Sequence, residues 1–150
     1  MPFWRLYYHL VLGTKNREPF IDGELEQQLF PYLVAKAVEM ESHVLAINGW
    51  VDHVHIVISI PPKYSISELV KRLKGASSHD FEGLWWQRGY GALSIGQRQL
   101  SVAVAYVENQ KVHHAQKTTI VWLEREEDED KADDGSIHEE RGVYEADIPF

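Results

Sequence analysis

Residues 51–60 read VDHVHIVISI, and their alternation limits which fold the rest of the chain can adopt. Successive side chains of a β-strand point to opposite faces. The valine and isoleucines at positions 54, 56, 58 and 60 would therefore form a wholly apolar face, and the opposite face would begin with His53 and His55. A shift of one residue would exchange the two faces, so the apolar face fixes the register of this strand.

Three further strands are predicted around it. Residues 3–12 are rich in aromatic and β-branched types and are followed by Gly13. Residues 43–49 precede a tight turn near Gly49 and would form a hairpin with the strand over 51–60, and residues 92–95 form a short last strand. Such runs bounded by turn residues are typical of a sheet.

Helices are predicted between and after these strands. Asp22 can cap a helix that runs from residue 23 toward 41, in which Pro31 predicts a kink or a split. Ser65 and Glu68 form a capping-box pattern for a helix over 65–78, and residues 97–114 predict one more helix. The order β-α-β-β-α-β-α favours an α+β fold, with a ferredoxin-like antiparallel sheet and helices on one face.

The composition suits one domain with an acidic end. The chain has 150 residues, 44% of them hydrophobic, and it has no cysteine, which excludes disulfides and thiolate metal ligands. The net charge of −8 at first argues against a nucleic-acid partner. However, residues 124–150 hold 12 of the 23 acidic residues and 3 of the 15 basic ones, which leaves +1 on residues 1–123. We therefore predict a domain over 1–123 and a flexible acidic tail over 124–150.

The sequence shows neither a signal-peptide layout nor an apolar run of the roughly 18 residues that a membrane helix needs. We therefore expect a soluble, cytoplasmic protein without a membrane partner.

His53 and His55 are candidate metal ligands. Residues i and i+2 of a strand share a face, so both imidazoles can reach one cation. An isolated H-x-H pattern is weak, and two histidines on a half-exposed strand are the simpler interpretation.

Tyr106 and Gln110 lie four residues apart in the last predicted helix, which places the phenol and the amide on one face. Alone, each is typical of an ordinary helix, where a tyrosine packs against the sheet and a glutamine meets solvent. Beside the two histidines, the pair instead indicates a hydroxyl nucleophile next to a third metal ligand.

A basic stripe follows the exposed face of the helix over 65–78. Ser67, Lys71, Lys74 and Ser78 recur at helical spacing, and Arg72 flanks them. Such a row can contact successive phosphates of a nucleic acid, and a solvated helix face is the alternative interpretation.

Five segments then occur in one order along the chain. They are YHLV (8–11) with TKNR (14–17), DHVHIV (52–57), LVKRLKG (69–75), WQRGYG (86–91), and YVENQ (106–110) with His113 and His114. Together they resemble the single-tyrosine transposases of small insertion sequences, called HUH enzymes after their histidine–hydrophobic–histidine motif, and the related REP-associated tyrosine transposases. The resemblance covers about residues 3–120, and the acidic tail has no counterpart in it.

The resemblance implies specific roles at the matching positions. His53 and His55 correspond to the pair that holds a divalent ion, Mg²⁺ or Mn²⁺, with Gln110 as third ligand and Tyr106 as nucleophile. Single-stranded or hairpin DNA would be cleaved and rejoined through a 5′-phosphotyrosine. The resemblance also implies a homodimer in which Tyr106 of one subunit serves the histidines of its partner. Exposed tryptophans at Trp85 and Trp86 could supply apolar interface, and a simple core position for both is the alternative interpretation.

Three alternatives are left open by the residues. The first is a non-catalytic nucleic-acid-binding module, because ferredoxin-like sheets serve that purpose too. The second is a domesticated relative that cuts DNA but no longer transposes. The third is a metal-dependent phosphodiesterase that uses water, in which Tyr106 only packs.

Overall fold

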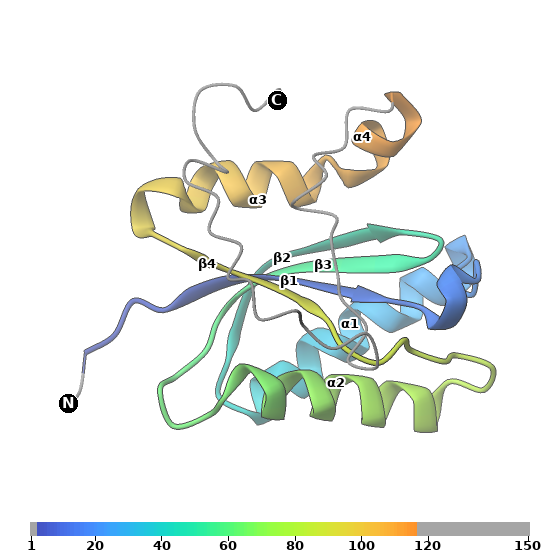
Figure 1. The fold of residues 1–150 in the computed structure, drawn as a ribbon, viewed down its shortest axis with the longest axis horizontal. Coiled ribbons are helices and arrows are strands. Elements are labelled where there is room, and N and C mark those ends of the chain that lie inside the picture. Colours follow the sequence, from blue (N-terminus) through green and yellow to red (C-terminus); the bar gives the residue numbers. More distant parts are fainter. Residues whose placement is uncertain (1–2, 117–150) are drawn as a thin grey trace, which may run out of the picture.

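The computed structural model describes residues 3–116, which form one four-stranded sheet with helices on both faces (Figure 1). The strands are β1 (Tyr7–Gly13), β2 (His43–Trp50), β3 (His53–Ser59) and β4 (Gly91–Ile95). The helices are α1 (Gly23–Glu39), α2 (Ile66–Asp80), α3 (Leu100–Glu108) and α4 (Gln110–Gln116), with short 3₁₀ turns η1 (Lys15–Arg17) and η2 (Gln97–Gln99). The predicted acidic tail over 124–150 lies outside the described residues.

The strand order is β2-β3-β1-β4, and every pair is antiparallel. This confirms the predicted ferredoxin-like sheet, in which β1 and β3 are the two central strands. The first strand is shorter than expected, because it begins at Tyr7 instead of residue 3.

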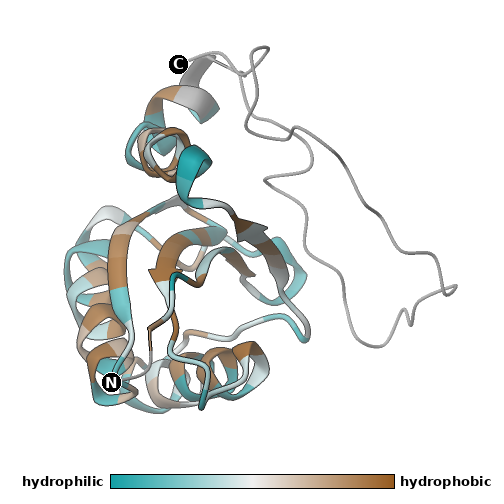
Figure 2. Cartoon of the chain, turned by 90° about the vertical axis from the view of Figure 1, so that its left-hand side faces the viewer, coloured by the Kyte–Doolittle hydropathy of each residue, from teal (hydrophilic) through white to brown (hydrophobic). Residues whose placement is uncertain are grey.

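One face of the sheet packs on α1 and α2, as the alternation over residues 51–60 predicts. Val54, Ile56 and Ile58 of β3 are buried there, with leucines from both helices in the same core cluster. Complete burial of each such side chain contributes about 1.5–3 kcal/mol. In Figure 2 the strands are largely hydrophobic where they lie between the helical layers.

The opposite face of the sheet is covered by α3, which Figure 1 shows on the far side from α1 and α2. Val57 of β3 packs there with Ala103, Tyr106 and Val107. The prediction of helices on one face only is therefore wrong, because the apolar helix α3 covers the second face, which carries the histidines of β3.

The split predicted at Pro31 is wrong, because α1 is one unbroken helix from Gly23 to Glu39. Proline removes the hydrogen bond to the carbonyl four residues earlier, here that of Gln27. Both Gln27 and Pro31 are exposed, so water can hydrate that carbonyl.

The single helix predicted over 97–114 is also wrong, because α3 ends at Glu108 and α4 begins at Gln110. Asn109 Nδ2 donates to the carbonyl of Ala105 at 2.8 Å, and Asn48 Nδ2 of β2 donates to the carbonyl of Glu108 at 3.0 Å. The Ala105 carbonyl also accepts the backbone N–H of Asn109 at 3.1 Å, whereas the Glu108 carbonyl, at the last residue of α3, is satisfied by the side chain from β2.

Candidate active site

His53 and His55 point from β3 toward the helix that covers the second face. Both are fully buried, and their ring centroids are 4.9 Å apart in an edge-to-face arrangement. The simpler interpretation of a half-exposed strand is therefore wrong, since α3 and α4 exclude solvent from the imidazoles. Buried polar rings need partners, and each histidine has at least one.

The partner of His55 is His9, a residue that sequence reasoning included in a motif but gave no role. His9 lies on β1, is fully buried, and its Nε2 is 2.7 Å from Nδ1 of His55. The register pairs His9 with Val57, so His9 and His55 are diagonal neighbours on one face. The contact leaves Nε2 of His55 as the ring nitrogen directed away from β1.

The partner of His53 is Asp52, whose Oδ1 is 2.7 Å from Nδ1 of His53. Burial by itself would raise the pKa of the Asp52 carboxyl, but the hydrogen bond with His53 and the nearby guanidinium of Arg17 together lower it below its ordinary value. Asp52 is therefore a carboxylate that fixes the orientation of the His53 ring. Such a carboxylate–histidine pair is common behind metal ligands.

Tyr106 and Gln110 reach the same face from the helices. Both are fully buried, and the Tyr106 ring centroid lies 6.0 Å from that of His55 and 6.2 Å from that of His9. The structure thus places Tyr106 beside the two histidines of β3, and it buries Gln110 one helical turn further along, at the start of α4.

A lysine holds α4 in this position. Lys111 Nζ donates to Oδ1 of Asn48 and to the carbonyl of Gly49, both at 2.7 Å, and also contacts the Glu26 carboxylate. An ammonium has three hydrogens to donate. These contacts tie the start of α4 to the end of β2 and to α1.

The donor set fits a divalent metal ion. Two imidazoles and one amide oxygen on a buried surface are ligands that Mn²⁺, and less readily Mg²⁺, accepts. Within residues 3–116, no three His, Cys, Asp or Glu side chains converge as a metal-binding group.

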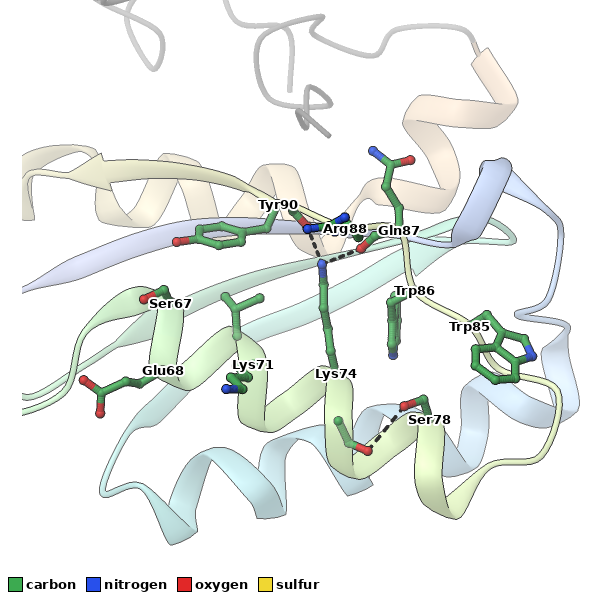
Figure 3. Close-up of a pocket in the computed structure, with 13 residues that line it drawn as sticks. Ser67, Glu68, Lys71, Lys74, Ser78, Trp85, Trp86, Gln87, Arg88 and Tyr90 are labelled. Carbon is green, nitrogen blue, oxygen red and sulfur yellow. Dashed lines mark hydrogen bonds between the residues drawn. The ribbon is translucent and has the colours of Figure 1, made fainter. Parts of the chain in front are cut away.

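The predicted DNA-contacting residues lie on the other face of the sheet, along α2 (Figure 3). Lys71, Lys74 and Ser78 line an open groove of about 640 Å³, together with Trp85 and Arg88. Trp85 is 61% exposed, so the core interpretation is wrong for this tryptophan. The neighbouring Trp86 is half-buried and donates to Ser77 Oγ at 2.9 Å, so it belongs partly to the core.

The four residues predicted to contact DNA differ in their own contacts. Lys71 is exposed, whereas Lys74 Nζ donates to the carbonyl of Gln87 at 2.7 Å and also contacts that of Gly89. Arg72 pairs with Glu39 at 3.2 Å and lies outside the groove lining, and Ser78 is half-buried. Lys71 is therefore the cation of this set most available to a phosphate, while Lys74 also supports the 87–89 loop.

None of the helices within residues 3–116 combines the length and apolar character that crossing a membrane requires.

The sequence profile of one protein family, described as IS200-like transposases, matches residues 2–110. The matched range contains His53, His55, Tyr106 and Gln110. It therefore includes every predicted catalytic and metal-binding position.

Two curated relatives are similar in sequence. The ISDra2 transposase TnpA of Deinococcus radiodurans is 29% identical over 119 residues, which cover 71% of this chain and 85% of the relative. The transposase for insertion sequence element IS200 of Salmonella typhimurium is 28% identical over 120 residues, which cover 71% of this chain and 78% of the relative.

Two solved structures share the fold. A crystallised protein of Deinococcus radiodurans R1, assigned as a transposase, has a TM-score of 0.58 at 26% identity, over 73% of this chain and 93% of its own. A REP-associated tyrosine transposase bound to a REP hairpin has a TM-score of 0.61 at 16% identity, over 76% of this chain and 74% of its own. The second likeness supports the fold alone.

Proposed function

Since the chain belongs to the family of IS200-like transposases, we propose that it cleaves and rejoins single-stranded DNA, with Tyr106 as the nucleophile and a divalent metal ion bound by His53, His55 and Gln110. The observation that carries the proposal is the complete burial of all four side chains, with Tyr106 packed beside the two histidines on one face of the sheet. Apolar side chains at these buried positions would stabilise the fold more, because buried polar groups cost free energy unless they are paired.

The chemistry follows from the phenol of Tyr106. Its oxygen attacks the scissile phosphorus, a new P–O bond forms, and the bond from phosphorus to the 3′ oxygen breaks. The phenol loses one proton and the 3′ oxygen gains one, which yields a 5′-phosphotyrosine and a free 3′-hydroxyl. One phosphate ester replaces another, so rejoining needs no nucleotide cofactor.

His53, His55 and Gln110 would hold the ion, and Asp52 and His9 would orient the two imidazoles behind it. Bound Mg²⁺ or Mn²⁺ would polarise the scissile phosphate and offset charge in the transition state. The surrounding helices exclude water, which favours transfer of the phosphotyrosine to another strand over hydrolysis.

The proposed substrate is single-stranded or hairpin DNA. A relative of the same fold was solved with a REP hairpin, and this chain presents Lys71, Arg72, Lys74 and Ser78 along α2. These residues would contact phosphates, which positions the DNA without reading its sequence. Trp85 offers an exposed aromatic surface beside them for an unpaired base.

We also propose a homodimer that exchanges its tyrosine helices. In the single chain, Tyr106 is fully buried against its own sheet, so a DNA strand can reach the phenol only if α3 moves. Transfer of α3 to the sheet of a partner subunit is a movement that would open the site and rebuild it in trans.

The decisive experiment is a denaturing gel with labelled oligonucleotides that span the DNA flanking the coding sequence. The wild type with Mn²⁺ should give a covalent protein–DNA adduct, and Tyr106→Phe should give none while its DNA affinity stays nearly unchanged. Tyr64→Phe is the matched control, because that hydroxyl contacts Glu41 on the other side of the sheet.

Each alternative function gives a different gel. Adduct formation by Tyr106→Phe at the wild-type rate would show that Tyr106 is not the nucleophile. Metal-dependent cleavage without an adduct would indicate a phosphodiesterase that uses water, and binding without cleavage would indicate a non-catalytic module.

A further inference from the structure

His114 of α4 is the residue near the proposed metal site that the proposed function does not yet use. Its Nε2 lies 3.1 Å from Nε2 of His53. Nδ1 of His53 faces Asp52, so Nε2 is the nitrogen left for a metal ion, and His114 stands directly beside it. The spacing of four residues from Gln110 also places His114 and Gln110 on the same side of α4.

The His114 ring is held in place by Trp50. The two rings are stacked, 5.0 Å between centroids and 10° between planes. Trp50 pairs directly with His53 across the β2–β3 ladder, so its indole and the His53 imidazole share one face. The end of the hairpin therefore supplies both the first imidazole and the surface that orients the second.

The separation of the two nitrogens suits a shared ion. Nitrogen ligands lie about 2.1 Å from a divalent metal, so two of them in adjacent positions at a right angle would be about 3.0 Å apart. The observed 3.1 Å is close to that value. Two Nε2 atoms at this distance share one proton when no ion is present, and an ion would replace that proton.

We propose that His114 is a further ligand of the divalent metal ion, beside His53, His55 and Gln110. The inference rests on the metal site of the proposed function. Within the described part of the chain, the three imidazoles do not converge as a metal-binding group. Coordination of one ion by all three would therefore require the rings of His55 and His114 to move closer together. A third imidazole would favour Mn²⁺, Co²⁺ or Zn²⁺ over Mg²⁺, which prefers oxygen ligands.

The first test is calorimetric titration of the full-length protein with Co²⁺ and with Mn²⁺. His114→Ala should bind each ion at least about tenfold more weakly. His79→Ala is the matched control, since that imidazole is 87% exposed on α2, and it should bind both ions as the wild type does. Unchanged affinity in His114→Ala would overturn the proposal. So would tighter binding, which would show that His114 competes with the ion.

The second test does not depend on affinity. The chain has no cysteine, so a thiolate-to-Co²⁺ charge-transfer absorption can arise only from an introduced thiol. His114→Cys should show this absorption with Co²⁺, and His79→Cys should not. Absence of the absorption in a folded His114→Cys protein that still binds Co²⁺ would refute the proposal.

His53→Ala and His55→Ala distinguish failure of the whole metal site from failure of the role of His114 alone. If both still bind Co²⁺ as the wild type does, the metal site of the proposed function is wrong. If both lose Co²⁺ while the His114 variants behave as the wild type, only the role of His114 is wrong.

Discussion

Replacement of His9 by leucine tests how the buried histidine pair supports the site. His9 Nε2 and His55 Nδ1 are 2.7 Å apart, and both rings are fully buried. His9→Leu leaves Nδ1 of His55 without this partner in a place that water does not reach. The loss of one partner of a buried hydrogen bond costs about 1–3 kcal/mol. For a chain of this size, the melting temperature should fall by about 3–10 °C.

The same substitution should weaken metal binding, because the His55 ring loses the contact that orients it. Removal of such an orienting partner costs about 10- to 100-fold in affinity. His9→Gln keeps a side-chain amide that can donate or accept, so it should retain more of both properties. The assays are thermal unfolding in chelator and calorimetric titration with Mn²⁺.

His43→Leu provides the matched control, since His43 is exposed at the start of β2 and should change stability by less than about 0.5 kcal/mol. A His9→Leu protein with wild-type melting temperature would contradict the energetic argument. A lower melting temperature with unchanged metal affinity would show that His9 supports the fold but does not orient His55.

Three further substitutions test other contacts. Lys71→Ala should lower the slope of log affinity against log salt by about 0.7 for single-stranded DNA, and an unchanged slope in a binding titration would assign this lysine to a solvated face. Lys111→Met removes two hydrogen bonds of 2.7 Å and should lower the free energy of unfolding by about 1–2 kcal/mol, a modest loss because solvent partly screens these contacts. Denaturation in urea measures this free energy, and no change would mean that the lysine does not hold α4. Ser65→Ala should cost about 1 kcal/mol in the same assay, since Ser65 Oγ accepts from the backbone N–H of Glu68 at 3.1 Å; equal stability would show that this cap contributes nothing.

Local patterns predicted the elements that depend on neighbouring residues. The alternation over 51–60 gave the register of β3, and the caps at Asp22 and Ser65 both accept the hydrogen bonds that their positions predict. Each of these features is set within about ten residues of sequence, where periodicity and capping are visible.

Features that depend on distant residues were not predicted. The end of α3 relies on Asn48, which is 60 residues from Glu108 in the sequence. The burial of His53 and His55 follows from α3, a helix that is apolar on nearly every side and therefore covers the sheet instead of lying at its edge. His9 acquired a role only through the β1–β3 register, since one histidine in an apolar strand has no spacing that marks it.

The complete burial of Tyr106 in a single chain raises the question of whether catalysis occurs in cis or in trans. Tyr106 packs on the sheet of its own chain, and Lys111 and Asn48 hold the junction of α3 and α4 on β2. All of these contacts would form equally well with the sheet of a partner, because a second copy presents the same surface. Helix exchange would therefore preserve the contacts while it changes which chain supplies the tyrosine.

Two inactive variants distinguish the arrangements when they are mixed under conditions that let subunits reassort. One is Tyr106→Phe and the other is His55→Ala. In a trans arrangement, the heterodimer has one site with both lesions and one with neither, so up to about half of the mixed dimers' sites regain adduct formation. In a cis arrangement, every site keeps one lesion and the mixture forms no adduct. Persistent inactivity, with heterodimers identified by native mass spectrometry, would rule out exchange of the tyrosine helices, and DNA would then have to reach Tyr106 through movement of α3 within one chain.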